Sequence, residues 1–348
     1  MIMVINSMTI NRLPLLSNLL FIFVVPLLLH SQARGSLPEP YKETRMLLHT
    51  FVEIKAYGAN AKRAVEASFA EMERVNRLLN NYDPSSEISQ INRAAGLKSI
   101  TISPETLEAL TSAKYYGELS GGALDITVGP LLELWGFNQE EPGIKADLPL
   151  PDILNRVKQL VDYRLLQLDI IKSTAMLPKK GMWIDTGSFT KGYAVDRAAS
   201  VLKKQGITQV LITAGGTILA LGKKPGGTSW QVGIRHPREE GKLLGSTPLE
   251  DQAISTSGDY ERFYHYRGHR ICHIIDPRSG QPVESVQSIS VIAPTAMASD
   301  VLSTVLFVLG AQKGLSLVEN LPGVEAMITD QEGKVYLSPG WPARIKQR

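Results

Sequence analysis

The positions of apolar residues along the chain divide it into short strands and amphipathic helices. Apolar and polar residues alternate over 50–57, which predicts a strand, whereas apolar residues recur at helical spacing over 61–80, which predicts a helix. Ser103 is suited to cap a helix and Pro104 to be its first residue, so another helix is expected to begin there. Further helices are predicted at about 152–160, 190–205 and 297–309, the last two ending at Gly206 and Gly310. Further strands are predicted at about 165–168, 210–212, 230–234, 253–256, 271–275, 288–292 and 323–328.

These strands and helices follow one another without a strict alternation. That order favours an α+β or mixed α/β fold, in which mixed sheets carry helices on their outer faces. The chain has 348 residues, enough for one large domain or for two closely packed lobes. Residues 139–151 are rich in proline, glycine and acidic side chains and are expected to form a surface loop.

The first 33 residues have the parts of a secretory signal. Residues 15–29 are almost wholly apolar, and Ser31 and Ala33 are the small residues at positions −3 and −1 of a cleavage after Ala33. An uncleaved membrane anchor is the alternative, although this apolar run is shorter than the roughly 20 residues of a spanning helix. We therefore expect a targeting segment at 1–33 and a domain at 34–348. The protein is expected in the periplasm, and residues 15–29 would attach it to the inner membrane if the segment is not cleaved.

Composition and charge exclude several classes of partner and site. With 43% hydrophobic residues, 20% charged residues and a net charge of +3, the chain has the balance of a globular protein and no sign of nucleic-acid binding. Its single cysteine, Cys272, cannot form an internal disulfide and belongs to no zinc-site spacing. A single thiol also suits an oxidising compartment.

Asp300 and Thr304 are the first candidates for chemistry. They lie four residues apart in the helix that begins near Thr295, so their oxygen atoms share one face of that helix. A carboxylate and a hydroxyl are hard oxygen ligands, which suit Mg²⁺ or Ca²⁺. The alternative is that Asp300 caps a neighbouring group and that Thr304 bonds to the carbonyl four residues earlier.

The segment 273–280 runs from a strand into a turn and places His273 and Asp276 where that strand ends. Histidine is the side chain whose ordinary pKa suits the work of a general base near neutral pH. The alternative is a structural histidine beside an aspartate that caps the turn.

Residues 184–193 lead into the helix predicted at 190–205. An anion beside the start of a helix is stabilised by the helix dipole, and Lys191 adds a positive charge there. Small polar loops at 214–217 and 255–260 would also let backbone N–H groups approach phosphates. The alternative is that Ser188 or Thr190 only caps the helix and that the two loops are plain turns.

Taken together and in this order, these segments resemble the FAD:protein FMN transferase family, also called the ApbE family. The resemblance covers about 50–337 and rests on residues 122–137, 185–196, 256–260, 273–282 and 293–304. It implies a single large domain related to the T-fold. It also implies an enzyme that uses Mg²⁺ to transfer the FMN half of FAD to a threonine hydroxyl of an acceptor protein, with release of AMP.

The resemblance also implies roles for individual residues. Asp300 and Thr304 would bind Mg²⁺ together with the backbone carbonyl of Ser188. The residues that would contact FAD are Tyr82, Ala123, Leu124, Asp125, Asp185, Lys191 and Ile275. Members of the family often open the first strand with Met-Gly-Thr, where this chain has Leu48-His49-Thr50. The methionine contact is therefore not carried over, and His49 adds bulk near the site.

His273 is accordingly expected to take the proton of the acceptor hydroxyl, with Asp276 positioning His273 or the substrate. The resemblance implies an acceptor that is a flavin-bearing subunit of a membrane electron-transport complex. An FAD pyrophosphatase is the first alternative, because water would replace threonine at the same residues. A non-catalytic exported flavin-binding protein and a structural, partner-binding periplasmic domain are the others.

Overall fold

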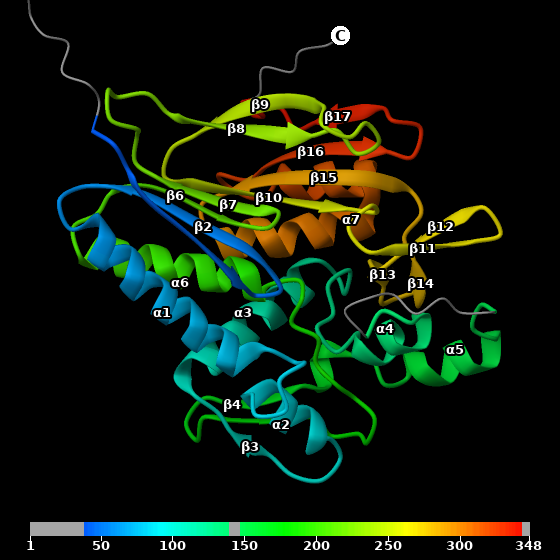
Figure 1. The fold of residues 1–348 in the computed structure, drawn as a ribbon. Coiled ribbons are helices and arrows are strands. Elements are labelled where there is room, and N and C mark those ends of the chain that lie inside the picture. Colours follow the sequence, from blue (N-terminus) through cyan, green and yellow to red (C-terminus); the bar gives the residue numbers. More distant parts are fainter. Residues whose placement is uncertain (1–37, 139–146, 343–348) are drawn as a thin grey trace, which may run out of the picture. The chain divides into compact units, whose positions relative to one another are not determined.

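The structure is a computed structural model that describes residues 38–138 and 147–342, so the targeting segment 1–33 and residues 139–146 of the expected loop lie outside it. An eight-stranded antiparallel sheet with the order β1-β2-β6-β7-β10-β15-β16-β17 forms its centre (Figure 1). Its strands are β1 (Tyr41–Leu47), β2 (Thr50–Tyr57), β6 (Gln209–Ala214), β7 (Thr217–Leu221), β10 (Gln252–Gly258), β15 (Val286–Ala293), β16 (Glu325–Asp330) and β17 (Val335–Leu337).

Three long helices cover one face of this sheet: α1 (Ala61–Leu79), α6 (Thr190–Lys204) and α7 (Ala296–Val318) (Figure 1). The helical spacing predicted over 61–80 is confirmed, since Val65, Phe69 and Met72 of α1 are fully buried. On the other face lies the hairpin of β8 (Trp230–Arg235) and β9 (Leu243–Leu249), whose Trp230 packs with Ile254 of the sheet. The sheet is thus buried on both faces in its middle.

Smaller elements surround the ends of these layers. One group contains α2 (Glu87–Arg93), α3 (Pro104–Leu119), the 3-10 helix η1 (Tyr163–Leu165) and the sheet of β3 (Ile100–Thr101), β5 (Thr174–Met176) and β4 (Gln167–Asp169). The other contains α4 (Gly129–Trp135), α5 (Pro151–Lys158) and the pairs β11 (Phe263–Tyr266) with β12 (His269–Cys272) and β13 (Ile275–Asp276) with β14 (Gln281–Pro282). The expected fold class, an α+β domain of sheets and flanking helices, is confirmed.

Two predicted boundaries are wrong. The strand expected over 271–275 is two strands, because β12 ends at Cys272, β13 begins at Ile275, and each pairs with a different neighbour. The helix expected to end at Gly310 loses helical geometry there, with φ 73° and ψ −178°, but the chain resumes a helix as far as Val318. Glycine is suited to this conformation, so it interrupts α7 without ending it.

Helix α7 is long and apolar enough to cross a membrane by length and composition. It packs against β10, β15 and α6, and residues such as Val301, Val305 and Phe307 are fully buried. Its apolar composition is therefore accounted for by its place in the core.

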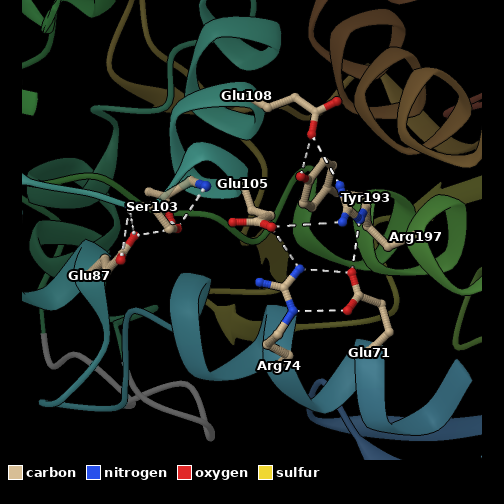
Figure 2. A network of polar contacts seen from close by, with 9 residues as sticks. Glu71, Arg74, Glu87, Ser103, Glu105, Glu108, Tyr193 and Arg197 are labelled. Atoms are coloured by element: carbon tan, nitrogen blue, oxygen red, sulfur yellow. Dashed lines mark hydrogen bonds and ion pairs between the residues drawn. The ribbon is translucent and has the colours of Figure 1, made fainter. Parts of the chain in front are cut away.

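A polar network ties α1, α3 and α6 together (Figure 2). Glu71 of α1 accepts hydrogen bonds from Arg74 at 2.9 Å and from Arg197 of α6 at 3.0 Å. Tyr193, also on α6, donates to Glu108 of α3 at 2.7 Å. Partly exposed ion pairs each contribute little, but as a network they fix the orientation of α6. Because Tyr193 is in the first turn of α6, this network holds the end of the helix that faces the candidate site.

Candidate active site

A cavity of about 820 Å³ lies beside the start of α6, within the range of small-molecule sites. Its walls come from the β1–β2 turn, the end of α1, the start of α6, the face of α7 and the base of the β11–β12 hairpin. All predicted site residues except Asp276 line it. The predicted polar loops after β6 and at the end of β10 also reach it. Residues far apart in the sequence therefore meet in one cavity.

Hard oxygen donors gather where α6 crosses α7. Asp300, Thr304 and Ser188 all line the cavity, and Asp300 is only 6% exposed. Burial raises the pKa of Asp300, although Lys191, whose Nζ lies 3.6 Å from Oδ1, acts in the opposite direction. The described residues include no group of three His, Cys, Asp or Glu side chains that could hold a metal ion. A cation here would therefore depend on hydroxyl, carbonyl and substrate oxygens beside one carboxylate, a set that fits Mg²⁺.

A close crossing of α6 and α7 fixes this corner. A Cβ on Gly192 would lie 2.4 Å from the carbonyl oxygen of Ala296, so only glycine permits this approach. The Gly192 N–H donates to Asp300 Oδ2 at 3.0 Å. Asp196, one turn further along α6, accepts the N–H groups of Ala296 and Met297, each at 2.8 Å. Asp196 thus satisfies the first turn of α7 and holds it against α6.

His273 is oriented by the backbone of Arg262. The carbonyl oxygen of Arg262 lies 3.1 Å from His273 Nδ1 and 3.0 Å from the His273 backbone nitrogen. Because a carbonyl only accepts, Nδ1 carries the proton of the neutral ring and Nε2 keeps a free electron pair. Burial, reinforced by the charges of Arg262 and Lys191, lowers the pKa of His273 to about 4. The ring is therefore a neutral proton acceptor at physiological pH.

Comparison with known proteins assigns the chain to a family. The family model described as ApbE family matches residues 48–328, which is most of the chain. The chain belongs to the ApbE family.

Relatives and solved structures of the ApbE family cover most of this chain. The FAD:protein FMN transferase of Salmonella typhimurium is 31% identical over 83% of this chain and 85% of its own length. That of Haemophilus influenzae is 34% identical over 75% of this chain and 77% of its own. The crystal structure of the ApbE protein of Thermotoga maritima superposes with a TM-score of 0.78 at 31% identity, covering 86% of this chain and 97% of that one.

Asp276 is the predicted residue that the structure places elsewhere. Its carboxylate binds Arg278 at 2.8 and 2.9 Å and accepts the Arg278 backbone N–H, so it closes the turn after β13. Within the described part of the chain, the contact that orients His273 comes from the Arg262 carbonyl and not from Asp276. Asp276 therefore does not position His273 here and instead caps the turn, as in the alternative reading, while its expected role in positioning the substrate stays a prediction.

Asp185 and Tyr82 form another wall of this ApbE-family cavity. Asp185 accepts hydrogen bonds from the Gly187 N–H at 2.9 Å and from the Asn81 amide at 3.2 Å, and burial raises the pKa of Asp185. Tyr82 is 40% exposed, and its ring lies edge-on to His49 with the centroids 5.4 Å apart. An exposed aromatic ring at the cavity edge is suited to stack on a planar ligand.

Asp125 has local partners for both carboxylate oxygens. One oxygen accepts the Thr127 N–H at 2.7 Å and the Thr127 hydroxyl at 2.6 Å, and the other accepts the Tyr163 N–H at 2.8 Å. These bonds hold the loop that brings Ala123 and Leu124 to the cavity. The side chain of Asp125, which lines the cavity itself, therefore also holds this wall in shape.

The sequence placed Leu48 and His49 near the site but did not predict their conformation. They are the two turn residues between β1 and β2, with φ 56° and 57°, in the left-handed region that glycine prefers. Arg262 and Thr190 line the cavity, and within the described chain the buried Thr190 Oγ1 has no hydrogen-bond partner. No pattern in the sequence singled out Arg262 as a residue of the site.

Proposed function

We propose that this ApbE-family chain is a Mg²⁺-dependent transferase that moves FMN from FAD to a threonine hydroxyl of an acceptor protein and releases AMP. One observation carries the proposal. An oriented, neutral His273 and the oxygen donors Asp300 and Thr304 line the same cavity. A base and a cation site in one cavity are the parts that phosphoryl transfer to a hydroxyl requires.

The metal is assigned to the corner between α6 and α7. Asp300, Thr304 and the Ser188 carbonyl are the donors that would hold it, and the burial of Asp300 favours a cation beside its carboxylate. When bound there, Mg²⁺ would neutralise the negative charge of the phosphates. The side chain of Ser188 has no part in this assignment, since its carbonyl is the donor.

The pyrophosphate of FAD is assigned to the start of α6. The first turn of this 15-residue helix presents the positive end of the helix dipole to the cavity. Thr190 Oγ1 is buried there without a protein partner in the described chain, and a phosphate oxygen would satisfy it. Lys191, also in this turn, adds a positive charge. Tyr82, Ala123, Leu124, Asp125, Asp185 and Ile275 remain available for the rest of FAD.

The transfer itself needs one proton acceptor. The threonine oxygen attacks the phosphorus of the FMN phosphate, the phosphorus–oxygen bond to AMP breaks, and AMP leaves with that electron pair. His273 Nε2 takes the hydroxyl proton, because Nδ1 is committed to the Arg262 carbonyl. General-base catalysis of this kind typically contributes about 10² to 10⁴ in rate. With water in place of threonine, the same step would yield free FMN.

Flavin transfer, flavin hydrolysis and flavin binding can be separated in one experiment. The purified full-length chain is incubated with FAD, Mg²⁺ and a purified flavin-bearing domain of a membrane electron-transport subunit. Covalent flavin fluorescence on the acceptor with release of AMP supports the proposal, and an acceptor with its threonine replaced by valine is the control. Free FMN and AMP with an unlabelled acceptor would indicate a pyrophosphatase. Intact bound FAD would indicate a flavin carrier, and no bound flavin would indicate a structural protein.

The place of action is also part of the proposal. Residues 1–33 direct export, and the enzyme works in the periplasm beside a membrane-bound acceptor. The apolar run and the small residues before position 34 support this assignment. Cell fractionation with antibody detection tests it: the chain is expected in the periplasm or at the inner membrane, and recovery from the cytosol would contradict export.

A further inference from the structure

Arg262 and His273 occupy facing positions at the base of one hairpin. Phe263 of β11 pairs with Cys272 of β12, and Arg262 and His273 are the next residues outward on each strand. Both line the cavity. The hairpin therefore brings a cationic side chain and the proposed base to the same place.

The Arg262 side chain extends along the cavity wall. Its Nη2 donates to the Phe137 carbonyl at 2.9 Å, which fixes the direction of the guanidinium. Burial raises the pKa of Asp185, and the charge of Arg262 acts against that rise. The same charge contributes to the lowered pKa of His273, after burial. The guanidinium thus lies close enough to both groups to act on them.

The charges around the cavity make Arg262 distinctive. Of the described residues that line it, Lys191 and Arg262 are the lysine and arginine side chains. Lys191 is directed at Asp300 and donates to the Gly187 carbonyl at 3.1 Å, so it belongs to the corner between α6 and α7. Arg262 supplies the positive charge on the hairpin side, beside His273. A substrate with two phosphates requires compensation on both sides.

We infer that the Arg262 guanidinium binds the non-bridging oxygens of the phosphoryl group that is transferred, and that Arg262 is a catalytic residue of this reaction. The inference rests on the proposed function. A base that serves the attacking hydroxyl lies next to the phosphorus, so a neighbouring guanidinium reaches the oxygens on that phosphorus. Its planar fork matches two such oxygens. An arginine in this position stabilises charge in the transition state and typically contributes about 10³ to 10⁵ in rate.

Arg262→Gln tests the inference in the full-length chain, with Arg267→Gln at the exposed tip of the same hairpin as the matched control. Transfer and FAD hydrolysis are measured with FAD and Mg²⁺, and FAD binding is measured by flavin fluorescence. We expect kcat to fall at least about 100-fold in both reactions. FAD affinity is expected to change less than tenfold, and Arg267→Gln to retain the wild-type rate. A kcat within threefold of wild type, or one restored by saturating FAD, would overturn the inference.

A second variant distinguishes a catalytic role of Arg262 from a purely structural one. Arg262→Lys keeps the positive charge and a donor for the Phe137 carbonyl but loses the planar fork, so kcat is expected to fall at least about tenfold. Guanidinium ion added to Arg262→Ala is expected to restore part of the rate, which restored packing alone would not do. Full activity of Arg262→Lys, or absence of rescue, would overturn the inference. An inactive wild type would refute the proposed function instead.

Discussion

Lowering the pH tests the chemical state of His273 directly. An exposed imidazole titrates near pH 6.5, but burial, together with the charges of Arg262 and Lys191, lowers the pKa of His273 to about 4. The neutral ring, which is the form that accepts a proton, therefore persists far into the acid range. We expect transfer to survive at a pH where an ordinary histidine base would be switched off.

The expected size of the effect follows from these two values. At pH 5.5 a base with a pKa of about 4 is almost entirely neutral, whereas one at 6.5 is about one-tenth neutral. The two cases thus differ about tenfold in kcat/KM for FAD, a parameter that reports ionisations of the free enzyme. The lowered pKa of His273 also makes the stability of the fold depend on pH. Because the unfolded chain takes up a proton on His273 at a higher pH than the folded protein does, the free energy of unfolding falls by up to about 3 kcal/mol as the pH falls from 6.5 to 4.

The assay measures kcat/KM for FAD from pH 4.5 to 8 with Mg²⁺ held at saturation. Enzyme returned from each pH to pH 7.5 must regain its rate, which controls for unfolding. The residual activity of His273→Ala supplies the second control, because any acid limb that it retains belongs to the cavity carboxylates. An acid limb with a midpoint between 6 and 7 in the wild type, absent from His273→Ala, would refute the lowered pKa.

Three further predictions concern the corner between α6 and α7. Asp300→Asn should lower the rate of FMN transfer at least about 100-fold and abolish saturation in a Mg²⁺ titration, because the variant lacks the negatively charged carboxylate ligand of the metal. Gly192→Ala should destabilise the fold by about 1–3 kcal/mol in urea unfolding, since its Cβ would meet the α7 backbone; an unchanged midpoint would contradict the crossing. Thr190→Val should weaken FAD binding roughly five- to tenfold, measured by fluorescence titration, because it removes one hydrogen bond to phosphate; unchanged affinity would place the phosphates elsewhere.

Local patterns predicted what depends on local geometry. The spacing of Asp300 and Thr304 placed both on one face of a helix, and that helix begins near Thr295 as expected, with Thr295 capping it through its side chain. Ser103 likewise caps α3. These features depend on residues within about one helical turn of each other, so they can be predicted from the sequence.

The features that were missed depend on contacts between distant segments. His273 lies in a break between β12 and β13, and the residue that orients it, Arg262, is its neighbour only through hairpin pairing. Asp196 supports the first turn of α7 only because α6 and α7 cross closely at Gly192. Neither the register of a hairpin nor the crossing of two helices is encoded in a local pattern, and both decide which side chains meet.

The two sides of the cavity are held by different supports, which bears on how a mutation would affect catalysis. Asp300 and Thr304 lie on the core helix α7, whereas Arg262 and His273 lie at the base of a hairpin outside the central sheet. That hairpin is tied to the sheet by Asp259, a buried residue directly after β10, which binds Arg238 at 2.6 and 2.7 Å and Arg270 of β12 at 3.1 Å. A buried carboxylate shared by two arginines is costly to disturb, because its loss leaves charges unpaired. Changes at Asp259 should therefore displace His273 and Arg262 together while leaving Asp300 and Thr304 in place.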